Sequence, residues 1–428
     1  MVRISKFSYE NPRFKNLTNR GSGIPESVEQ VVKGVIADIR ERGDEALHEY
    51  MKKFDGSDID EIGLMVSDEE FEIAKKSVSE EFKKSVKEAC DNIIKFHKKQ
   101  LNLGYEETYD DGVVLQRKYK PIENVAVTVP SANGALISSL YMNLIPAVVA
   151  GVPNIYVLSK PRKDGTIDEH LLYVADYLGV RNYYKICGSQ GLAAVAIGTE
   201  TVKKVDAVLG PGNNYTQMAK KLLYGQVKID SLAGPSEIAI IADDSANATF
   251  IAADMMSQAE HGTGFEASTT FCLSEEKANE INAEIERLTK ENNLVAATER
   301  TFENYGDIFV VDDIEDAIKA VNMIAPEHAE VICESAEEVA EKIVNAGAVF
   351  VGAYSTEPVG DYYCGSNHIL PTCGTARFSA GMSVNEFLRG YSVIKYTEEA
   401  LKKNADSIIK LAETEKLYAH ALAVKVRK

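Results

Sequence analysis

The chain has 428 residues, and its 47 Lys and Arg against 65 Asp and Glu give a formal net charge of −18 at pH 7. This acidic balance argues against nucleic-acid or membrane-surface binding, because both partners carry negative phosphate groups. Hydrophobic residues make up 45% of the chain and charged residues 26%, so a substantial core can form and general disorder is not expected. At about 150 residues per domain, the length suggests two or three domains.

The six cysteines form neither a CxxC pair nor a zinc-finger spacing. Residues 1–16 mix charges without the apolar segment of a signal peptide, and no stretch of about 18 apolar residues is long enough to span a membrane. We therefore expect a reduced, cytoplasmic protein.

The first hundred residues favour helices. Apolar residues recur at helical spacing from Val28 to Ile39, and this helix is expected to end at Gly43. A second helical stretch, rich in Lys and Glu, is expected from about Ser67 to Leu101.

From Val125 onward, short β-rich runs alternate with helical patterns, which is typical of right-handed βαβ units with a parallel sheet. The first set of expected strands covers residues 125–129, 155–158, 184–186 and 205–209. The second set covers residues 238–241, 269–273, 309–311, 331–333 and 348–351. Between the later strands, Asp313 and a Ser335–Glu338 capping box are expected to start helices, and a Lys/Glu-rich helical tail is expected after Tyr396.

Gln258 and His261 are expected on the last turn of a helix, at positions i and i+3 of one face. A carbonyl oxygen and an imidazole nitrogen on one face can serve as two metal ligands. The alternative is a polar last turn in which His favours the negative end of the helix.

Glu327 and His328 follow Pro326, which ends a helix before a strand. An adjacent carboxylate and imidazole suit proton transfer near neutral pH, although a simple turn pair explains them equally. A long polar loop with Asp361 and His368 follows the expected strand 348–351, where α/β enzymes place functional groups.

Glu415 and His420 lie in the helical tail. Five residues rotate a straight helix by about 140°, so the two side chains would not share a face and a solvated helix surface explains them. The chain has no GxGxxG motif, but the turns at 187–191 and 210–213 each follow a strand and open a helix, as an anion site does. Tight-turn chemistry would also explain these glycines.

Taken together, these segments resemble the histidinol dehydrogenase family. The longest match runs from Ile229 to Glu237 and continues from Ala253 to His261. Further matching motifs are Arg42-Gly43-Asp44, Lys53-Phe54-Asp55-Gly56, Gly198-Thr199-Glu200-Thr201, Gly210-Pro211-Gly212-Asn213, Pro326-Glu327-His328, Asn367-His368, Ala376-Arg377-Phe378, and Glu415 with Ala419-His420.

The resemblance implies oxidation of L-histidinol to L-histidine, the last step of histidine biosynthesis, in two NAD-dependent steps through an enzyme-bound aldehyde. It also implies one zinc ion per subunit, which would hold the substrate, with Gln258, His261, Asp361 and His420 as its ligands. His328 would be the base that removes the alcohol proton, and Glu327 would activate the water that hydrates the aldehyde.

Other residues match the family's contacts with substrate and cofactor. Substrate contacts would come from Ser236, His368 and Glu415, together with Gln258, His261, His328, Asp361 and His420. Cofactor contacts would come from Thr128, Gln190 and Asn213. In the family, Glu415 and His420 belong to the partner subunit, so the resemblance implies a homodimer.

The fold class that we expect is α/β, with two Rossmann-like domains that lack GxGxxG, a helical N-terminal segment and a small helical C-terminal tail. The expected division is an N-terminal arm (1–22), a larger α/β domain (23–127 with 237–380), a nucleotide-binding α/β domain (128–236) and the C-terminal tail (381–428).

The chain departs from the family on the cofactor side, where Thr128-Val129-Pro130-Ser131-Ala132 replaces Tyr-x-Pro-Gly-Gly. A zinc- and NAD-dependent dehydrogenase of the same fold that oxidises another polar primary alcohol, such as a sulfonated diol, is therefore the main alternative. A non-catalytic nucleotide-binding protein and a hydrolytic metalloenzyme are the other two.

Overall fold

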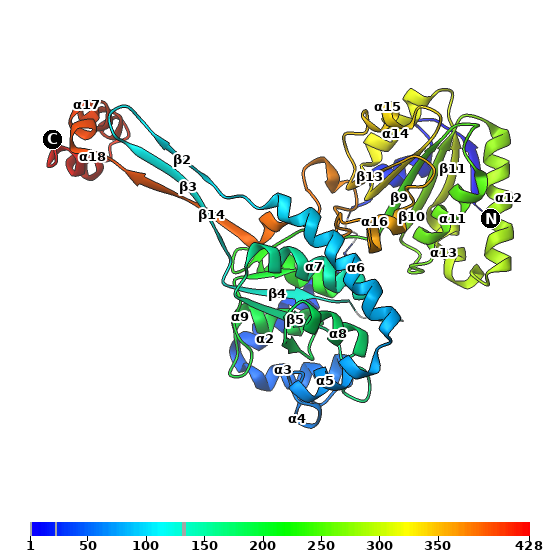
Figure 1. The fold of residues 1–428 in the computed structure, drawn as a ribbon, viewed down its shortest axis with the longest axis horizontal. Coiled ribbons are helices and arrows are strands. Elements are labelled where there is room, and N and C mark those ends of the chain that lie inside the picture. Colours follow the sequence, from blue (N-terminus) through cyan, green and yellow to red (C-terminus); the bar gives the residue numbers. More distant parts are fainter. Residues whose placement is uncertain (1, 22–23, 131–133) are drawn as a thin grey trace.

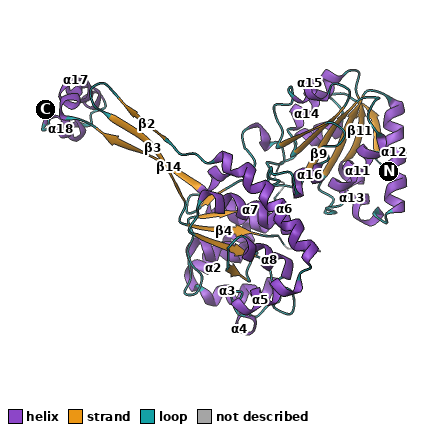
Figure 2. Cartoon of the chain, in the orientation of Figure 1, coloured by secondary structure: helices purple, strands orange, loops and turns teal. Residues whose placement is uncertain are grey.

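The computed structural model describes residues 2–21, 24–130 and 134–428. They form two α/β units and a long arm that extends from one of them and carries the C-terminal helices (Figure 1). Helices surround both sheets, whereas the strands of the arm have none along their length (Figure 2).

The first unit is built on a six-stranded sheet in which every neighbouring pair is parallel. Its strands, in spatial order, are β1 (Arg3–Lys6), β11 (Gly306–Val310), β10 (Ala267–Cys272), β9 (Glu237–Ala242), β12 (His328–Ile332) and β13 (Ala348–Val351). Its helices are α1 (Pro12–Thr18), α11 (Ala248–Ala259), α12 (Glu275–Glu291), α13 (Val295–Tyr305), α14 (Ile314–Ile324), α15 (Ala336–Ala340) and α16 (Glu357–Tyr362).

The second unit is built on a five-stranded parallel sheet. Its strands, in spatial order, are β6 (Asn182–Tyr184), β5 (Asn154–Leu158), β4 (Asn124–Thr128), β7 (Ala207–Leu209) and β8 (Lys228–Ile229). The helices that follow these strands are α7 (Ile137–Ala150), α8 (Glu169–Tyr177), α9 (Gly188–Ile197) and α10 (Asn214–Leu223). The α/β class and both sets of strands are confirmed, with strand ends shifted by at most three residues and β13 unshifted.

The N-terminal helices pack on the five-stranded sheet, whereas we expected residues 23–127 to join residues 237–380. These helices are α2 (Glu26–Arg42), α3 (Asp44–Tyr50), α4 (Ile59–Ile62), α5 (Asp68–Ser77) and α6 (Glu80–His97). The apolar face of α2 shares a core with Tyr156 and Leu158 of β5, and Cys90 and Ile93 of α6 share a core with α7. Helical periodicity identifies a buried face but not the sheet that covers it.

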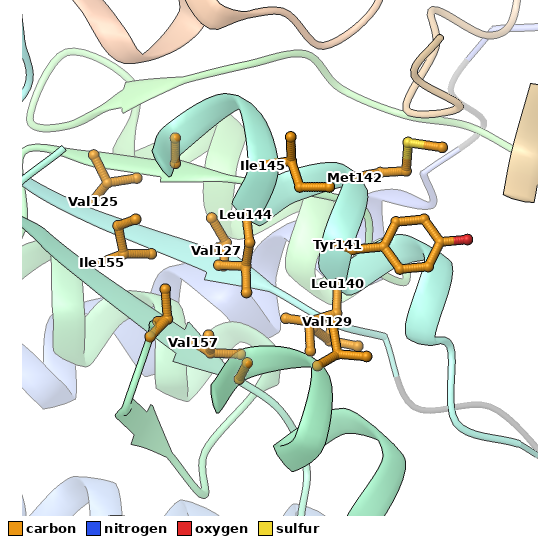
Figure 3. Packing of buried hydrophobic residues seen from close by; sticks show 14 of the residues in the cluster. Val125, Val127, Val129, Leu140, Tyr141, Met142, Leu144, Ile145, Ile155 and Val157 are labelled. Carbon is orange, nitrogen blue, oxygen red and sulfur yellow. The ribbon is translucent and has the colours of Figure 1, made fainter. Parts of the chain in front are cut away.

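The core between the five-stranded sheet and α7 is made mostly of aliphatic side chains, with Tyr141 and Met142 among them (Figure 3). Val125 and Val127 of β4 and Leu144 of α7 are fully buried. This packing holds β4 and α7 in place and thereby fixes the loops that leave the carboxyl ends of the strands, where a site is expected in such folds.

The N-terminal arm that we expected at 1–22 is part of the six-stranded unit. β1 extends the sheet beside β11, and Phe14 and Leu17 of α1 enter the core under it. The expected single helix from Ser67 to Leu101 is broken between α5 and α6, because Ser79 caps α6 by accepting the N–H of Phe82.

Two further helices differ in whether their expected capping residue caps them. Asp313 caps α14 as expected, by accepting the N–H of Asp316 at 2.9 Å. The Ser335–Glu338 capping box is wrong, since the Ser335 side chain makes no capping hydrogen bond, and a capping box lies instead at Ser67 and Glu70.

The long arm is a three-stranded antiparallel sheet that the sequence did not predict. Its strands are β2 (Tyr105–Thr108), β3 (Val114–Pro121) and β14 (Leu388–Lys395), and it leads to α17 (Glu398–Thr414) and α18 (Tyr418–Lys425). The helical tail is confirmed, but β14 lies within the range assigned to it. Among the described helices, none has the length and apolar character needed to cross a bilayer.

Candidate active site

A pocket of about 270 Å³ lies between the two α/β units. The six-stranded unit contributes Ser236, Glu327 and His328 to its lining, and the five-stranded unit contributes Ser139 and Pro211. The two units are joined beside it, where the Tyr141 hydroxyl of α7 donates to the carbonyl oxygen of Tyr362 at 3.0 Å.

His328 is the first residue of β12 and is almost completely buried. Its Nδ1 lies 3.1 Å from Oε1 of Gln258 on α11. Its Nε2 has no hydrogen-bond partner among the described residues and lies 3.6 Å from Oδ1 of Asp361. Because an amide oxygen accepts, Nδ1 carries the proton and Nε2 keeps a free lone pair. Burial, and then the neighbouring His368 and His261, lower the pKa of His328 to about 3, so the ring is neutral and can accept a proton.

Glu327 lies beside this ring, with its Oε2 4.0 Å from His328 Nδ1. The same oxygen accepts the backbone N–H of Glu237 at 3.2 Å, and the Ser236 hydroxyl also hydrogen-bonds to the carboxyl group. Burial, and then the charge of Asp361, raise the pKa of Glu327 well above its usual value. A cation in the pocket would counteract this shift.

Asp361 lies on α16, the short helix that begins in the polar loop we singled out. Burial, and then the carboxylate of Glu357 one turn earlier, raise the pKa of Asp361 to about 8. Ligand atoms of His328, Glu357 and Asp361 all lie within 4.8 Å of one another.

The donor set of the pocket fits a divalent metal ion. The described residues of the lining include carboxyl groups and imidazoles but neither Lys nor Arg. Gln258 and His261 lie at the end of α11, and the His261 Nδ1 is 3.3 Å from the Gln258 carbonyl oxygen. Mixed nitrogen and oxygen donors around mutually repelling carboxyl groups suit a borderline cation such as zinc.

His368 also lines the pocket, and its buried Nε2 has no hydrogen-bond partner among the described residues. Burial lowers its pKa to about 4, so it is neutral. The sequence interpretation missed Ser138, Ser139 and Glu357, which line the same pocket. For Glu357 a signal was available, since it precedes Asp361 by four residues and so shares its helix face.

Glu415 and His420 do not reach this pocket within the same chain. They lie at the far end of the arm, beside and within the C-terminal helices (Figure 1), and both are exposed. Lys416, in a left-handed conformation with φ of 60°, ends the straight helical path between them. Of the four expected metal ligands, His261 and Asp361 line the pocket, and Gln258 is buried in contact with His328. His420 lies elsewhere in the same chain.

A second pocket of about 630 Å³ opens at the carboxyl ends of the five-stranded sheet. Gln190 and Asn213 line it, with Phe54 and Tyr215 as exposed aromatic walls. Asp55 accepts a hydrogen bond from Gln190 Nε2 at 2.8 Å. Asp55 also pairs with Lys160 at 3.1 Å, although neither residue was singled out as a cofactor contact.

The two pockets share the turn at residues 210–213, because Pro211 lines the first and Asn213 the second. Gly210 has a φ of +107°, and a Cβ there would lie 2.7 Å from the carbonyl oxygen of Thr128, so this close approach requires glycine.

Thr128 was expected to contact the cofactor, but it is fully buried and lines neither pocket. Its hydroxyl donates to the Pro211 carbonyl oxygen at 2.7 Å, so the side chain holds the shared turn instead. Ser131 and Ala132 lie outside the described residues.

Comparison with known proteins places this geometry in context. A family model described as histidinol dehydrogenase matches residues 18–428. Histidinol dehydrogenase from Clostridium acetobutylicum is 42% identical over 417 residues, which cover 97% of this chain and 95% of that protein. The protein of the same name from Geobacillus kaustophilus is 43% identical, with 94% of each chain covered. A crystal structure of histidinol dehydrogenase from Elizabethkingia anophelis superimposes with a TM-score of 0.92 at 35% identity, covering 100% of this chain and 98% of that one.

Proposed function

The chain belongs to the histidinol dehydrogenase family, and we propose that it oxidises L-histidinol to L-histidine with two molecules of NAD. The observation that carries this proposal is the neutral His328, which presents a free Nε2 to the pocket beside the carboxyl group of Glu327. The comparisons do not favour the alternative of a sulfonated diol as substrate.

In the first step, His328 Nε2 accepts the hydroxyl proton of the substrate. NAD, when bound, would accept the hydride that leaves the substrate carbon. The product of this step is an aldehyde, which stays in the pocket. In the second step, Glu327 takes a proton from the water that adds to the aldehyde carbon. His328 passes its first proton to solvent and then accepts a hydroxyl proton of the resulting hydrate. The hydride that leaves the same carbon would go to a second NAD in place of the first, which yields the acid.

Gln258, His261 and Asp361 would hold a zinc ion, one in each subunit, with His420 of the partner subunit as the fourth protein ligand. When bound, zinc would hold the substrate by its nitrogen atoms and, as a dication, keep the nearby carboxyl groups ionised. Ser236 and His368 would contact the substrate from the pocket wall, since both line it.

The position of the arm supports a homodimer. Glu415 and His420 are exposed at its far end and cannot serve the pocket of their own chain, so each arm would deliver them to the other subunit's pocket. Leu411, Leu422 and Val426 are also exposed on the C-terminal helices, and such apolar side chains suit burial against a second copy.

NAD would bind in the second pocket, where Gln190 and Asn213 lie at the starts of α9 and α10. The shared turn at 210–213 would bring the nicotinamide end toward His328. The division into a nucleotide-binding unit and a larger unit, and a cytoplasmic location, stay predictions from the sequence.

The decisive experiment measures the NADH formed per L-histidine from L-histidinol, before and after metal chelation. We expect a ratio of two and a loss of turnover on chelation that zinc restores. A ratio below two contradicts the proposal. So does a protein that oxidises another alcohol but not L-histidinol. Binding of NAD or metal with no activity on any alcohol would instead support the non-catalytic alternative.

A further inference from the structure

A second contact lies below the pocket and joins the same two elements that hold His328 and Gln258. His328 and Glu330 are alternate residues of β12, so their side chains point to the same face of the sheet. Gln258 and Asp254 lie four residues apart on one face of α11. The carboxyl groups of Glu330 and Asp254 are in hydrogen-bond contact, directly beneath the His328–Gln258 contact of 3.1 Å.

The same two carboxyl groups hold the start of α16. The Thr356 hydroxyl donates to Asp254 Oδ1 at 2.5 Å, and the backbone N–H of Glu357 donates to Glu330 Oε1 at 2.8 Å. Thr356 precedes α16 but makes no capping hydrogen bond within it, since its hydroxyl is directed to Asp254. Asp361 lies one turn further along this short helix, so its position depends on where the helix begins.

The contact between the two carboxyl groups requires a proton. Asp254 is 7% exposed and Glu330 is 1% exposed. No N–H or O–H donor of the described residues reaches Glu330 Oε2, and two carboxylates offer only acceptors. Burial, and then the charge of Asp254, raise the pKa of Glu330 well above its usual value. A proton shared between the two carboxyl groups satisfies this contact.

We propose that Asp254 and Glu330 form a buried acid–carboxylate pair that positions β12, α11 and α16 beneath the active site. The inference rests on the proposed function, because it names what aligns Gln258 and Asp361 toward the metal and His328 toward the substrate. Neither member of the pair lines the pocket, so both are positioning residues.

Two substitutions of Glu330 test whether its hydrogen bonds position the metal ligands. Glu330→Gln keeps an oxygen for the Glu357 N–H and gains an N–H for Asp254, so it reproduces the protonated acid. Glu330→Met has a similar length but leaves the Glu357 N–H and Asp254 without that partner. We expect Glu330→Gln to stay within about threefold of the wild type in zinc affinity and kcat, whereas Glu330→Met should lose about 10- to 100-fold in zinc affinity.

Zinc affinity is measured on the metal-free full-length protein by competition with a chromophoric chelator, and folding by thermal melting. Asp307→Asn is the matched control, since Asp307 is an equally buried carboxyl group of β11. It pairs with Arg13 of α1, and neither residue lines the pocket. This control should lower the melting temperature and leave zinc affinity unchanged. If Glu330→Met binds zinc as the wild type does, the positioning role is wrong.

A large loss of zinc affinity or kcat in Glu330→Gln would also overturn the proposal, because it would show that the pair needs two ionisable groups. Infrared spectra test the proton directly: Glu330→Gln should lack one carboxylic-acid C=O stretch that the wild type shows, and identical spectra contradict the pair. If Glu330→Met does not fold, Thr356→Val is used instead, because it removes one contact of the pair. Unchanged zinc affinity in Thr356→Val would also contradict the positioning role.

An error in the positioning role can be told apart from an error in the proposed function. If the wild type neither binds zinc nor oxidises L-histidinol, the proposed function is wrong. If the wild type does both and the variants keep wild-type zinc affinity, only the positioning pair is wrong.

Discussion

Nδ1 of His328 lies 3.1 Å from Oε1 of Gln258, across the gap between β12 and α11. The contact sets the tautomer of the ring, because the amide oxygen can only accept and Nε2 is left as the free nitrogen. A strand and a helix that are 70 residues apart in the sequence thus define which atom of His328 can take a proton.

His328→Asn tests the base. The Asn side chain keeps a polar group near Gln258 but has no basic nitrogen, so kcat should fall by about 10²- to 10⁴-fold with little change in KM for L-histidinol. Steady-state kinetics on zinc-loaded protein measure this split, and thermal melting checks the fold. An unchanged kcat would remove His328 as the base.

His261→Asn tests the metal site. Removing one imidazole ligand should lower zinc content and activity together, by at least about tenfold at limiting zinc. Atomic absorption after dialysis measures the zinc. His48→Asn, on α3 and outside the pocket, is the matched control and should retain the metal. Full zinc occupancy in His261→Asn would refute the ligand assignment.

Much of the fold could be predicted because the buried parallel strands are nearly continuous apolar runs, such as residues 238–241 of β9. The arm could not, since β2 and β14 are partly or fully exposed and carry no apolar pattern against a core. Sequence patterns can also place a residue at the end of a strand, but they do not show which way its side chain points. Thr128 shows the consequence, because its hydroxyl turns inward to Pro211 and not toward the cofactor pocket.

The site itself was predictable where one local motif brings the groups together, as with Glu327 and His328. It was not predictable where tertiary contacts decide. Glu330 and Asp254 meet only because β12 packs beside α11, and Asp55 reaches Gln190 only through the packing of the N-terminal helices on the five-stranded sheet. No spacing in the sequence encodes these two contacts.

Gln190→Ala tests the cofactor pocket. Gln190 is buried and its amide donates to Asp55 at 2.8 Å, so its loss should disturb the pocket wall and raise KM for NAD by about tenfold. Zinc content and KM for L-histidinol should not change. The surface variant Gln226→Ala serves as the control. An unchanged KM for NAD would move the cofactor away from this pocket.

His97 gives the fold a dependence on acid. It is fully buried, its Nδ1 is 2.9 Å from the Ile93 carbonyl oxygen, and its Nε2 faces the Asn367 amide at 3.4 Å. Burial lowers its pKa, so between that value and the unfolded value of about 6.5 the unfolded chain binds more protons. The contribution of His97 to the free energy of unfolding is therefore fully present above about pH 6.5. It is lost as the pH falls, by at most about 1.4 kcal/mol per pH unit.

His97→Gln, which cannot titrate, should flatten this dependence. Urea unfolding of the metal-free protein at pH 7 and pH 5 measures the slope for the wild type and the variant, and the two slopes are compared because the substitution itself costs stability. Equal slopes would mean that His97 titrates alike in the folded and unfolded chains.

Subunit mixing tests whether His420 acts across the dimer. His328→Asn and His420→Asn homodimers should each be nearly inactive. In a mixed dimer, the subunit that carries His420→Asn keeps its own His328 and receives an intact His420 from the other subunit, so one site of the two is complete. After random exchange, about a quarter of wild-type activity should return. If His420 served its own chain, neither site of the mixed dimer would be complete and no activity would appear. Mixing wild type with a double variant, His328→Asn and His420→Asn, controls for exchange itself, because its mixed dimers should contain no complete site.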